Sequence, residues 1–174
     1  MTNKEFEASI KLIMNNDKNG LETIYKAYIT SIYFLIFSIV KNKENAEDIT
    51  ADFFIKLWSK AHIYNFKGHH KRWLMTLAHN MSIDFLRRNG KELLVDDFIP
   101  ESLSYSSMEN EVQSKLFMDS LLSNLKVSER EIVILHLVND LTFKDISKIL
   151  NKPLGSVTWQ YNSSLKKLRR FQYE

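Results

Sequence analysis

The sequence predicts an all-α protein built from two small helical domains, and three observations support this prediction. Apolar residues recur at helical spacing over most of the 174 residues, and no stretch alternates for long between apolar and polar residues as a strand does. Only 4 glycines and 2 prolines interrupt the chain. Residues 91–112 have no such period and are rich in acids, which is typical of a flexible linker. We therefore expect domains over residues 1–90 and 113–174.

Three amphipathic helices are expected in the first domain, over residues 21–40, 46–58 and 72–88. In the last two, one apolar stripe runs along each helix and the charged residues lie elsewhere. The stripes consist of Ala46, Ile49, Phe53 and Leu57, and of Leu74, Leu77, Ala78, Met81 and Phe85. Both stripes are expected to face the core.

The most apolar segment, residues 27–40, is expected to be a buried core helix. It contains Thr30, Ser31 and Ser38 and is shorter than the about 20 apolar residues that a membrane-spanning helix needs. The first 20 residues lack the apolar run and the small-residue cleavage site of a signal peptide. The chain has no cysteine, which excludes disulfides, thiolate metal sites and a cysteine nucleophile. We expect a cytoplasmic protein with no membrane insertion.

Charge is distributed unevenly along the chain. Residues 1–90 contain 13 Lys+Arg and 9 Asp+Glu (net +4), residues 91–112 contain 1 and 6 (net −5), and residues 113–174 contain 10 and 6 (net +4). Two basic domains joined by an acidic linker favour a polyanionic partner, although a net charge of this size is weak evidence on its own.

The second domain carries explicit signals for helix ends. Ser128 and Glu131 match a capping-box pattern before an apolar run, and Thr142 and Asp145 offer a weaker version before residues 143–150. Pro153 suits the first turn of a further helix, over about 153–170, because its missing N–H costs little there.

A short helix, a turn of about three residues and a longer helix form the pattern of a helix-turn-helix. Pro153 is expected to end the first helix and start the second, and Gly155 to allow a close approach to a neighbouring helix or to a phosphate. The face opposite Val157 and Leu168 carries amides, hydroxyls and cations, which can read base edges and neutralise phosphates. A generic helical hairpin with a solvated polar face remains the alternative interpretation.

Two separate stretches then resemble one family. "LLSNLKVSEREIVILHLVNDLTFKDISKILNKPLGSVTWQYNSSLKKLRR" is similar to the C-terminal DNA-binding domain of bacterial sigma factors of the extracytoplasmic-function (ECF) type. In the first domain, "AEDITADFFIKLW" resembles the family pattern AEDLxQExFLxLW, and "RWLMTLAHNMSIDFLRR" resembles xWLxxIAxNxxxDxxRR. The matches occur in the family's order and span almost the whole chain.

The resemblance implies a sigma factor that binds core RNA polymerase, directs it to a promoter and helps to open the DNA. The helix that matches AEDLxQExFLxLW would contact the polymerase clamp through Asp48, Ala51, Asp52 and Lys56. Ala51 departs from the family's usual Gln, so one polar contact is missing. The −10 element would be bound as duplex and melted strand by the following loop and helix, where aromatic platforms and cations suit unstacked bases. This set comprises Tyr64, Asn65, Phe66, Lys67, His70, Lys71, Arg72, Asn80, Arg87 and Arg88.

Recognition of the −35 element is expected from the last helix, through Ser156, Thr158, Trp159, Gln160, Asn162, Ser163, Lys166 and Lys167. Members of the family are often held by an anti-sigma factor, which is a further expected partner. Packing against the core is the alternative role for Tyr64 and Phe66.

Neither an enzyme nor a metal or cofactor site is expected. His69 and His70 are adjacent and His79 follows, but their spacing does not match a helical metal site. The sequence also lacks a phosphate-binding loop and a nucleophile elbow. The alternative functions are a helix-turn-helix regulator that acts without polymerase, and a helical enzyme or adaptor.

Overall fold

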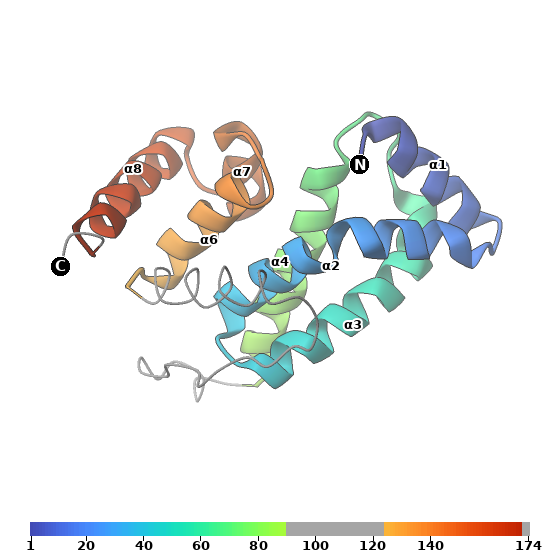
Figure 1. Ribbon diagram of the computed structural model, residues 1–174, viewed down its shortest axis with the longest axis horizontal. Coiled ribbons are helices and arrows are strands. Elements are labelled where there is room, and N and C mark those ends of the chain that lie inside the picture. The colour runs from blue at the N-terminus through green and yellow to red at the C-terminus, as the bar shows by residue number, and fades with distance from the viewer. Residues whose placement is uncertain (90–123, 172–174) are drawn as a thin grey trace.

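The computed structural model describes residues 1–89 and 124–171, and all regular secondary structure in these ranges is helical. The N-terminal part contains α1 (Asn3–Met14), α2 (Lys18–Val40), α3 (Lys43–Lys60), a short 3-10 helix η1 (Ala61–Ile63) and α4 (His70–Arg88). The C-terminal part contains α6 (Val127–Leu137), α7 (Phe143–Leu150) and α8 (Leu154–Phe171) (Figure 1). The predicted all-α fold is confirmed. The predicted linker over 91–112 lies outside the described residues.

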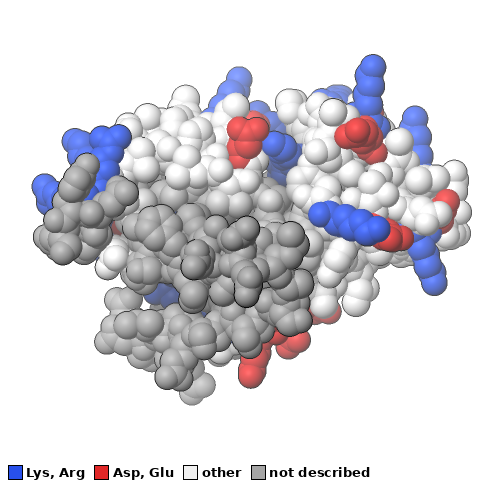
Figure 2. All heavy atoms as spheres, viewed as in Figure 1, with Lys and Arg blue, Asp and Glu red and all other residues white. Residues whose placement is uncertain are grey.

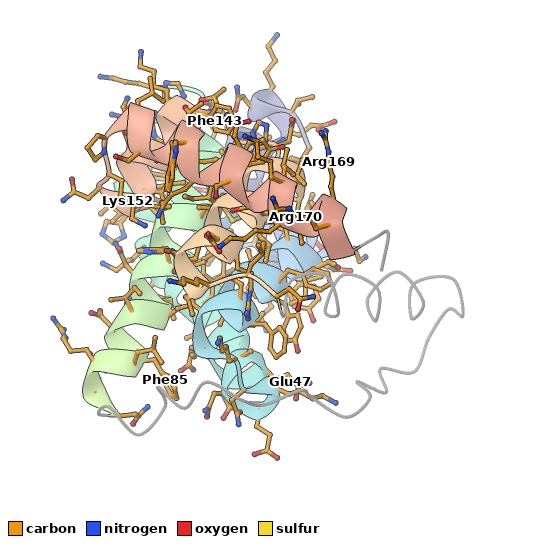
Figure 3. All side chains as sticks on the ribbon, turned by 90° about the vertical axis from the view of Figure 1, so that its left-hand side faces the viewer. Glu47, Phe85, Phe143, Lys152, Arg169 and Arg170 are labelled. Atoms are coloured by element: carbon orange, nitrogen blue, oxygen red, sulfur yellow. The ribbon has the colours of Figure 1, made fainter. Side chains whose placement is uncertain are left out.

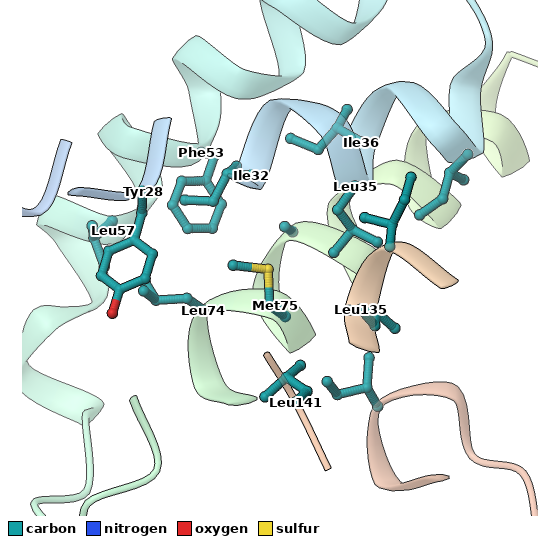
Figure 4. Close-up of a cluster of buried hydrophobic side chains, with 14 of the residues drawn as sticks. Tyr28, Ile32, Leu35, Ile36, Phe53, Leu57, Leu74, Met75, Leu135 and Leu141 are labelled. Carbon is teal, nitrogen blue, oxygen red and sulfur yellow. The ribbon is translucent and has the colours of Figure 1, made fainter. Parts of the chain in front are cut away.

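Helix α2 is the central element of the N-terminal part and packs against α1, α3 and α4. Its side chains Tyr28, Ile32, Leu35 and Ile36 are buried in the cluster drawn in Figure 4. By length and composition α2 resembles a membrane span, but 44% of its most apolar window is buried inside the protein. The expectation of a core helix over residues 27–40 is therefore confirmed.

The predicted apolar stripes of α3 and α4 also face the core. Ala46, Ile49, Phe53 and Leu57 are all buried, as are Leu74 and Ala78. Leu77, Met81 and Phe85 pack against this core as partly buried side chains. The 3.6-residue period alone was sufficient to identify both faces.

Helix α1 is an element that the sequence analysis missed. Its first turn is closed by a capping box in which Glu5 N–H donates to Thr2 Oγ1 (3.3 Å) and Thr2 N–H donates to Glu5 Oε2 (2.7 Å). Phe6, Ile10 and Ile13 are buried at helical spacing. At Gly20, an added Cβ would lie 2.3 Å from the Ser9 carbonyl oxygen. Only glycine permits α1 and α2 to approach this closely.

The helix ends of the C-terminal part follow the sequence at Thr142 and at the start of α8, and differ at Ser128 and at the end of α7. Thr142 caps α7, because its Oγ1 accepts from Asp145 N–H at 3.2 Å, as predicted. The predicted Ser128 cap is wrong: α6 begins at Val127, and Glu129 accepts from the N–H of Lys126 at 3.1 Å. Helix α7 ends at Leu150 and is capped by Asn151, whose φ of 50° is left-handed, so it stops before Pro153. Helix α8 begins directly after Pro153, whose carbonyl accepts from Val157 N–H at 3.1 Å.

The N-terminal and C-terminal parts pack together through α2 against α6 and α4 against α7. Figure 4 shows Leu135 and Leu141 beside Leu35 and Met75, and all four belong to one buried cluster. Two ion pairs cross the same boundary, Arg72 to Asp145 at 2.9 Å and Lys71 to Asp140 at 3.1 Å. The described residues of the two predicted domains therefore share a core. Whether the two domains are independent of each other stays a prediction.

Candidate nucleic-acid and polymerase interfaces

Helix α8 presents a polar face that no other described element covers. Ser156, Trp159, Asn162 and Lys166 are exposed at spacings of three or four residues, so they form one stripe, and Trp159 has 70% of its surface exposed. Beside this stripe, Lys152, Pro153, Gly155, Ser156, Trp159 and Gln160 line a shallow hollow. The helix therefore offers an aromatic ring, an amide, a hydroxyl and a cation along one line.

The remaining predicted members of this face are more constrained. Thr158 donates its hydroxyl to the Leu154 carbonyl at 3.0 Å, and Thr158 and Ser163 are half-buried. The Oε1 atom of Gln160 is buried without a partner. Lys167 is bound to Glu129, with 2.6 Å between Nζ and Oε1. These four side chains flank the exposed stripe instead of extending it.

Two features at the ends of α8 refine the sequence interpretation. An added Cβ at Gly155 would meet no atom within 4 Å, so the expected close approach to a neighbouring helix is wrong. At the other end, Arg169 and Arg170 are exposed, and Figure 3 shows them on α8 well separated from Lys152, which precedes the helix. Lys and Arg atoms gather at this end in Figure 2. The cations are therefore concentrated away from the start of the helix.

A second exposed face lies on α3. Asp48, Ala51 and Asp52 are exposed, and Lys56 is half-buried on the same side. Ile55, which the sequence analysis missed, lies one turn beyond Ala51 and is 69% exposed. Its position between Asp52 and Lys56 was a detectable signal, because an isoleucine off the apolar stripe must face outward. The face combines carboxylates with one large apolar side chain, a composition suited to a protein partner.

Phe54 and Trp58 contribute little to that surface. Phe54 is 6% exposed, and the Tyr25 ring covers it at a centroid distance of 4.8 Å. Trp58 is half-buried against the core. Tyr25 itself is 46% exposed, so α2 supplies the aromatic side chain next to the α3 face.

The loop between η1 and α4 has buried ends and an exposed middle. Asn65, Phe66 and Lys67 are exposed, whereas Tyr64 is 5% and His70 is 4% exposed. Tyr64 and His70 both contact the Phe6 ring of α1. Since both side chains are buried in this arrangement, we leave these two out of the proposed DNA surface.

His70 is held as a neutral imidazole. Its Nδ1 lies against Oδ1 of Asn3, which can only accept, so Nδ1 carries the proton. Its Nε2 then accepts from the Tyr28 hydroxyl at 2.5 Å. Burial lowers the pKa of His70 to about 4, with smaller contributions from Lys71 and the N-terminal ammonium. Burial likewise raises the pKa of Tyr28 to about 12.

On α4 the predicted cations fall into two groups. Lys71 and Arg72 are half-buried and bound to Asp140 and Asp145 of the C-terminal part. Asn80, Arg87 and Arg88 are exposed, and Arg87 also contacts Asp84 at 3.1 Å. Burial alone would raise the pKa of Asp145, but the Thr142 hydroxyl and the Arg72 guanidinium hold it below its usual value.

Two titratable groups lie near Lys152, namely Glu131, which is buried, and His79, which is half-buried. Burial raises the pKa of Glu131 on α6 to about 7, against the opposing effect of Lys152. Burial lowers the pKa of His79 on α4, whose Nδ1 has no partner. Neither group is exposed, so neither is placed on a candidate binding face.

Comparison with known proteins assigns both parts of the chain. Residues 24–92 match the Sigma-70 region 2 family, and residues 118–168 match the Sigma-70 region 4 family. The ECF RNA polymerase sigma factor SigM of Bacillus subtilis is 28% identical over 75% of this chain and 82% of its own length. SigW of the same organism is 23% identical over 92% and 93%, respectively.

Two solved structures share the fold. The sigma factor RpoE of Bartonella quintana, solved in complex with the anti-sigma factor NepR, gives a TM-score of 0.72 at 19% identity, over 90% of this chain and 98% of the other. CnrH, solved with the cytosolic domain of CnrY, gives 0.68 at 13% identity, over 97% of each chain. With both sigma regions present in order, the chain belongs to the ECF group of bacterial RNA polymerase sigma factors.

Proposed function

We propose that this sigma factor binds core RNA polymerase through α3 and directs it to promoters through the loop 65–69, α4 and α8. The observation that carries the assignment is the presence of both sigma regions in one chain, region 2 over residues 24–92 and region 4 over residues 118–168. A helix-turn-helix regulator without polymerase would need only the second of these. The protein acts as an initiation factor in the cytoplasm and leaves the chemistry of RNA synthesis to polymerase.

The polymerase-binding surface in this proposal comprises Asp48, Ala51, Asp52 and Lys56, to which we add Ile55. Carboxylates and a cation set orientation, and a central apolar side chain contributes burial. Because all five lie on the exposed side of α3, the helix can bind a partner without rearranging the core.

The −10 surface comprises the exposed residues Asn65, Phe66 and Lys67 together with Asn80, Arg87 and Arg88 of α4. An aromatic ring that protrudes among cations can stack an unpaired base while the cations bind the backbone. The −35 surface is the exposed stripe of α8, with Lys167 at its edge.

Binding both promoter elements requires the two parts to separate. The elements lie about 25 base pairs apart, which is about 85 Å at 3.4 Å per base pair. In the packed arrangement Arg72 lies 2.9 Å from Asp145 of α7, and α8 with its 18 residues extends only about 27 Å. Asp140 and Asp145 also form ion pairs with Lys71 and Arg72, which would otherwise be available to bind phosphates. The packed form therefore has to open before Lys71 and Arg72 reach DNA.

An anti-sigma factor is a further proposed partner. RpoE of Bartonella quintana was solved with one, and its chain is similar in fold to this one. Such a partner would compete with polymerase for the chain.

Run-off transcription with purified core polymerase tests the main proposal. Wild-type protein should support transcripts from a genomic promoter library, whereas Asp48→Arg should weaken polymerase binding strongly while the circular dichroism stays helical. Lys18→Glu, a charge reversal at an exposed position at the start of α2, is the matched control. If the wild type yields no transcript, the proposed function is wrong. If Asp48→Arg binds polymerase as well as the wild type, the assignment of α3 is wrong.

A further inference from the structure

Helix α1 lies outside the matched region 2. It nevertheless contacts both ends of the loop between η1 and α4, residues 64–69, which we call the −10 loop. The Phe6 ring lies between Tyr64, at a centroid distance of 5.1 Å, and His70, on which it stacks at 4.7 Å. Tyr64 precedes the exposed residues of the loop and His70 follows them. One fully buried side chain of α1 therefore sets the separation between the two ends of the loop.

Asn3 provides a second connection between α1 and the loop. Its Oδ1 accepts a hydrogen bond from Nδ1–H of His70. Its Nδ2 would lie 3.2 Å from a Cβ at Gly68, where φ is +74°. Gly68 thus combines a left-handed backbone with close packing against Asn3. Asn3 is an exposed residue, so these contacts are additions to the core and do not form it.

The middle of the loop is shaped by these fixed ends. Lys67 N–H donates to the Asn65 carbonyl at 2.6 Å, which closes a three-residue turn centred on Phe66. Phe66 is 42% exposed, and Lys11 of α1 lies 5.8 Å from the centroid of its ring. Three side chains of α1, namely Asn3, Phe6 and Lys11, therefore contact successive parts of one loop.

We propose that α1 is a positioning element for the −10 loop, and that Asn3 is a positioning residue that acts through His70 and Gly68. The inference rests on the proposed function, in which this loop captures bases of the −10 element. Asn3 does not contact DNA in this scheme. It holds the end of the loop from which Phe66 and Lys67 project, and so influences which bases fit.

The test uses full-length protein bound to core polymerase and a duplex promoter library randomised over the −10 segment. Asn3→Ala should lower transcription from the preferred −10 sequences about fivefold, the effect of losing one hydrogen bond. It should also change the ranking among −10 sequences, which a merely less stable protein would not do. Lys4→Ala, an exposed neighbour in the same turn, is the matched control and should keep the wild-type ranking. Asn3→Asp retains the acceptor for His70 and should also keep it.

The outcomes separate this inference from the proposed function. Phe66→Ala and Lys67→Ala should weaken −10 recognition whether or not α1 positions the loop. If they do so while Asn3→Ala keeps the wild-type ranking, the role of α1 is refuted and the loop assignment stands. The role of Asn3 would also be refuted if Asn3→Asp lost as much transcription from the preferred −10 sequences as Asn3→Ala. It would be refuted as well if Lys4→Ala changed the ranking among −10 sequences as much as Asn3→Ala. If Phe66→Ala and Lys67→Ala have no effect, the loop assignment itself fails.

Discussion

The −10 loop and the exposed stripe of α8 are both proposed to bind DNA, but different interactions hold them in place. The loop depends on residues distant in sequence: Phe6 stacks on His70, and Tyr28 of α2 donates to the same imidazole. The α8 stripe depends on the helix itself, since its members follow one another at helical spacing and Trp159 is 70% exposed. A surface supported by the core should therefore respond to changes in the core, whereas a surface on one helix should tolerate them.

Removal of the Phe6 ring should have the largest effect. Phe6→Ala should lower the free energy of unfolding by about 3–5 kcal/mol, because a fully buried aromatic side chain leaves a cavity among Tyr28, Tyr64, His70 and Trp73. Urea denaturation followed by circular dichroism measures the loss. A loss below about 1 kcal/mol would show that the loop is not supported as the structure indicates.

Lowering the pH should also reduce the free energy of unfolding, by somewhat less than the loss of the Phe6 ring. His70 is neutral in the folded protein, with its pKa lowered from 6.5 to about 4. The unfolded chain therefore takes up a proton first, and stability is lost as pH falls from about 6.5 towards 4. The full loss is up to about 3 kcal/mol at about 1.4 kcal/mol per pH unit.

Denaturation curves at intervals between pH 7 and pH 4.5 measure this loss. His70→Gln removes the titrating group, so the part of the pH dependence due to His70 should disappear. His62→Gln, at an exposed position nearby, is the control and should keep the wild-type profile. A His70→Gln protein with the unchanged wild-type profile would contradict the prediction.

Trp159→Ala should have the smallest effect on stability, within about 0.5 kcal/mol, because the side chain is exposed. Its effect should fall on recognition of the upstream element, since an apolar ring on the groove-facing stripe can contact a thymine methyl group. Urea denaturation and transcription from a library randomised over the −35 segment measure the two effects. A large loss of stability, or an unchanged −35 preference, would place Trp159 in a different role.

Local sequence signals predicted the helical elements well where they were strong. The periods of α2, α3 and α4, the Thr142 cap and the helix-turn-helix pattern were all identified without a structure. The capping pattern at Ser128 was misleading because the helix begins two residues earlier, where Glu129 accepts from the N–H of Lys126. Helix α1 was missed although Thr2 and Glu5 form a capping box and Phe6, Ile10 and Ile13 lie on one face. Both of these features are local, so the sequence contains the signal for this helix.

By itself, the sequence determined which residues form helices and which face of each helix is apolar, because these properties depend on neighbours within a few residues. The order of the two sigma regions came from the resemblance of two stretches to the family. The sequence also predicted a polar face on α8, of which the structure exposes Ser156, Trp159, Asn162 and Lys166. Only the tertiary structure decided that Tyr64 and His70 are buried, since their surroundings come from Phe6, Asn3 and Tyr28, which lie more than 35 residues earlier. The same holds for Lys71 and Arg72, whose carboxylate partners lie 69 and 73 residues later. A residue type can indicate DNA binding, but packing decides whether its side chain is free to bind.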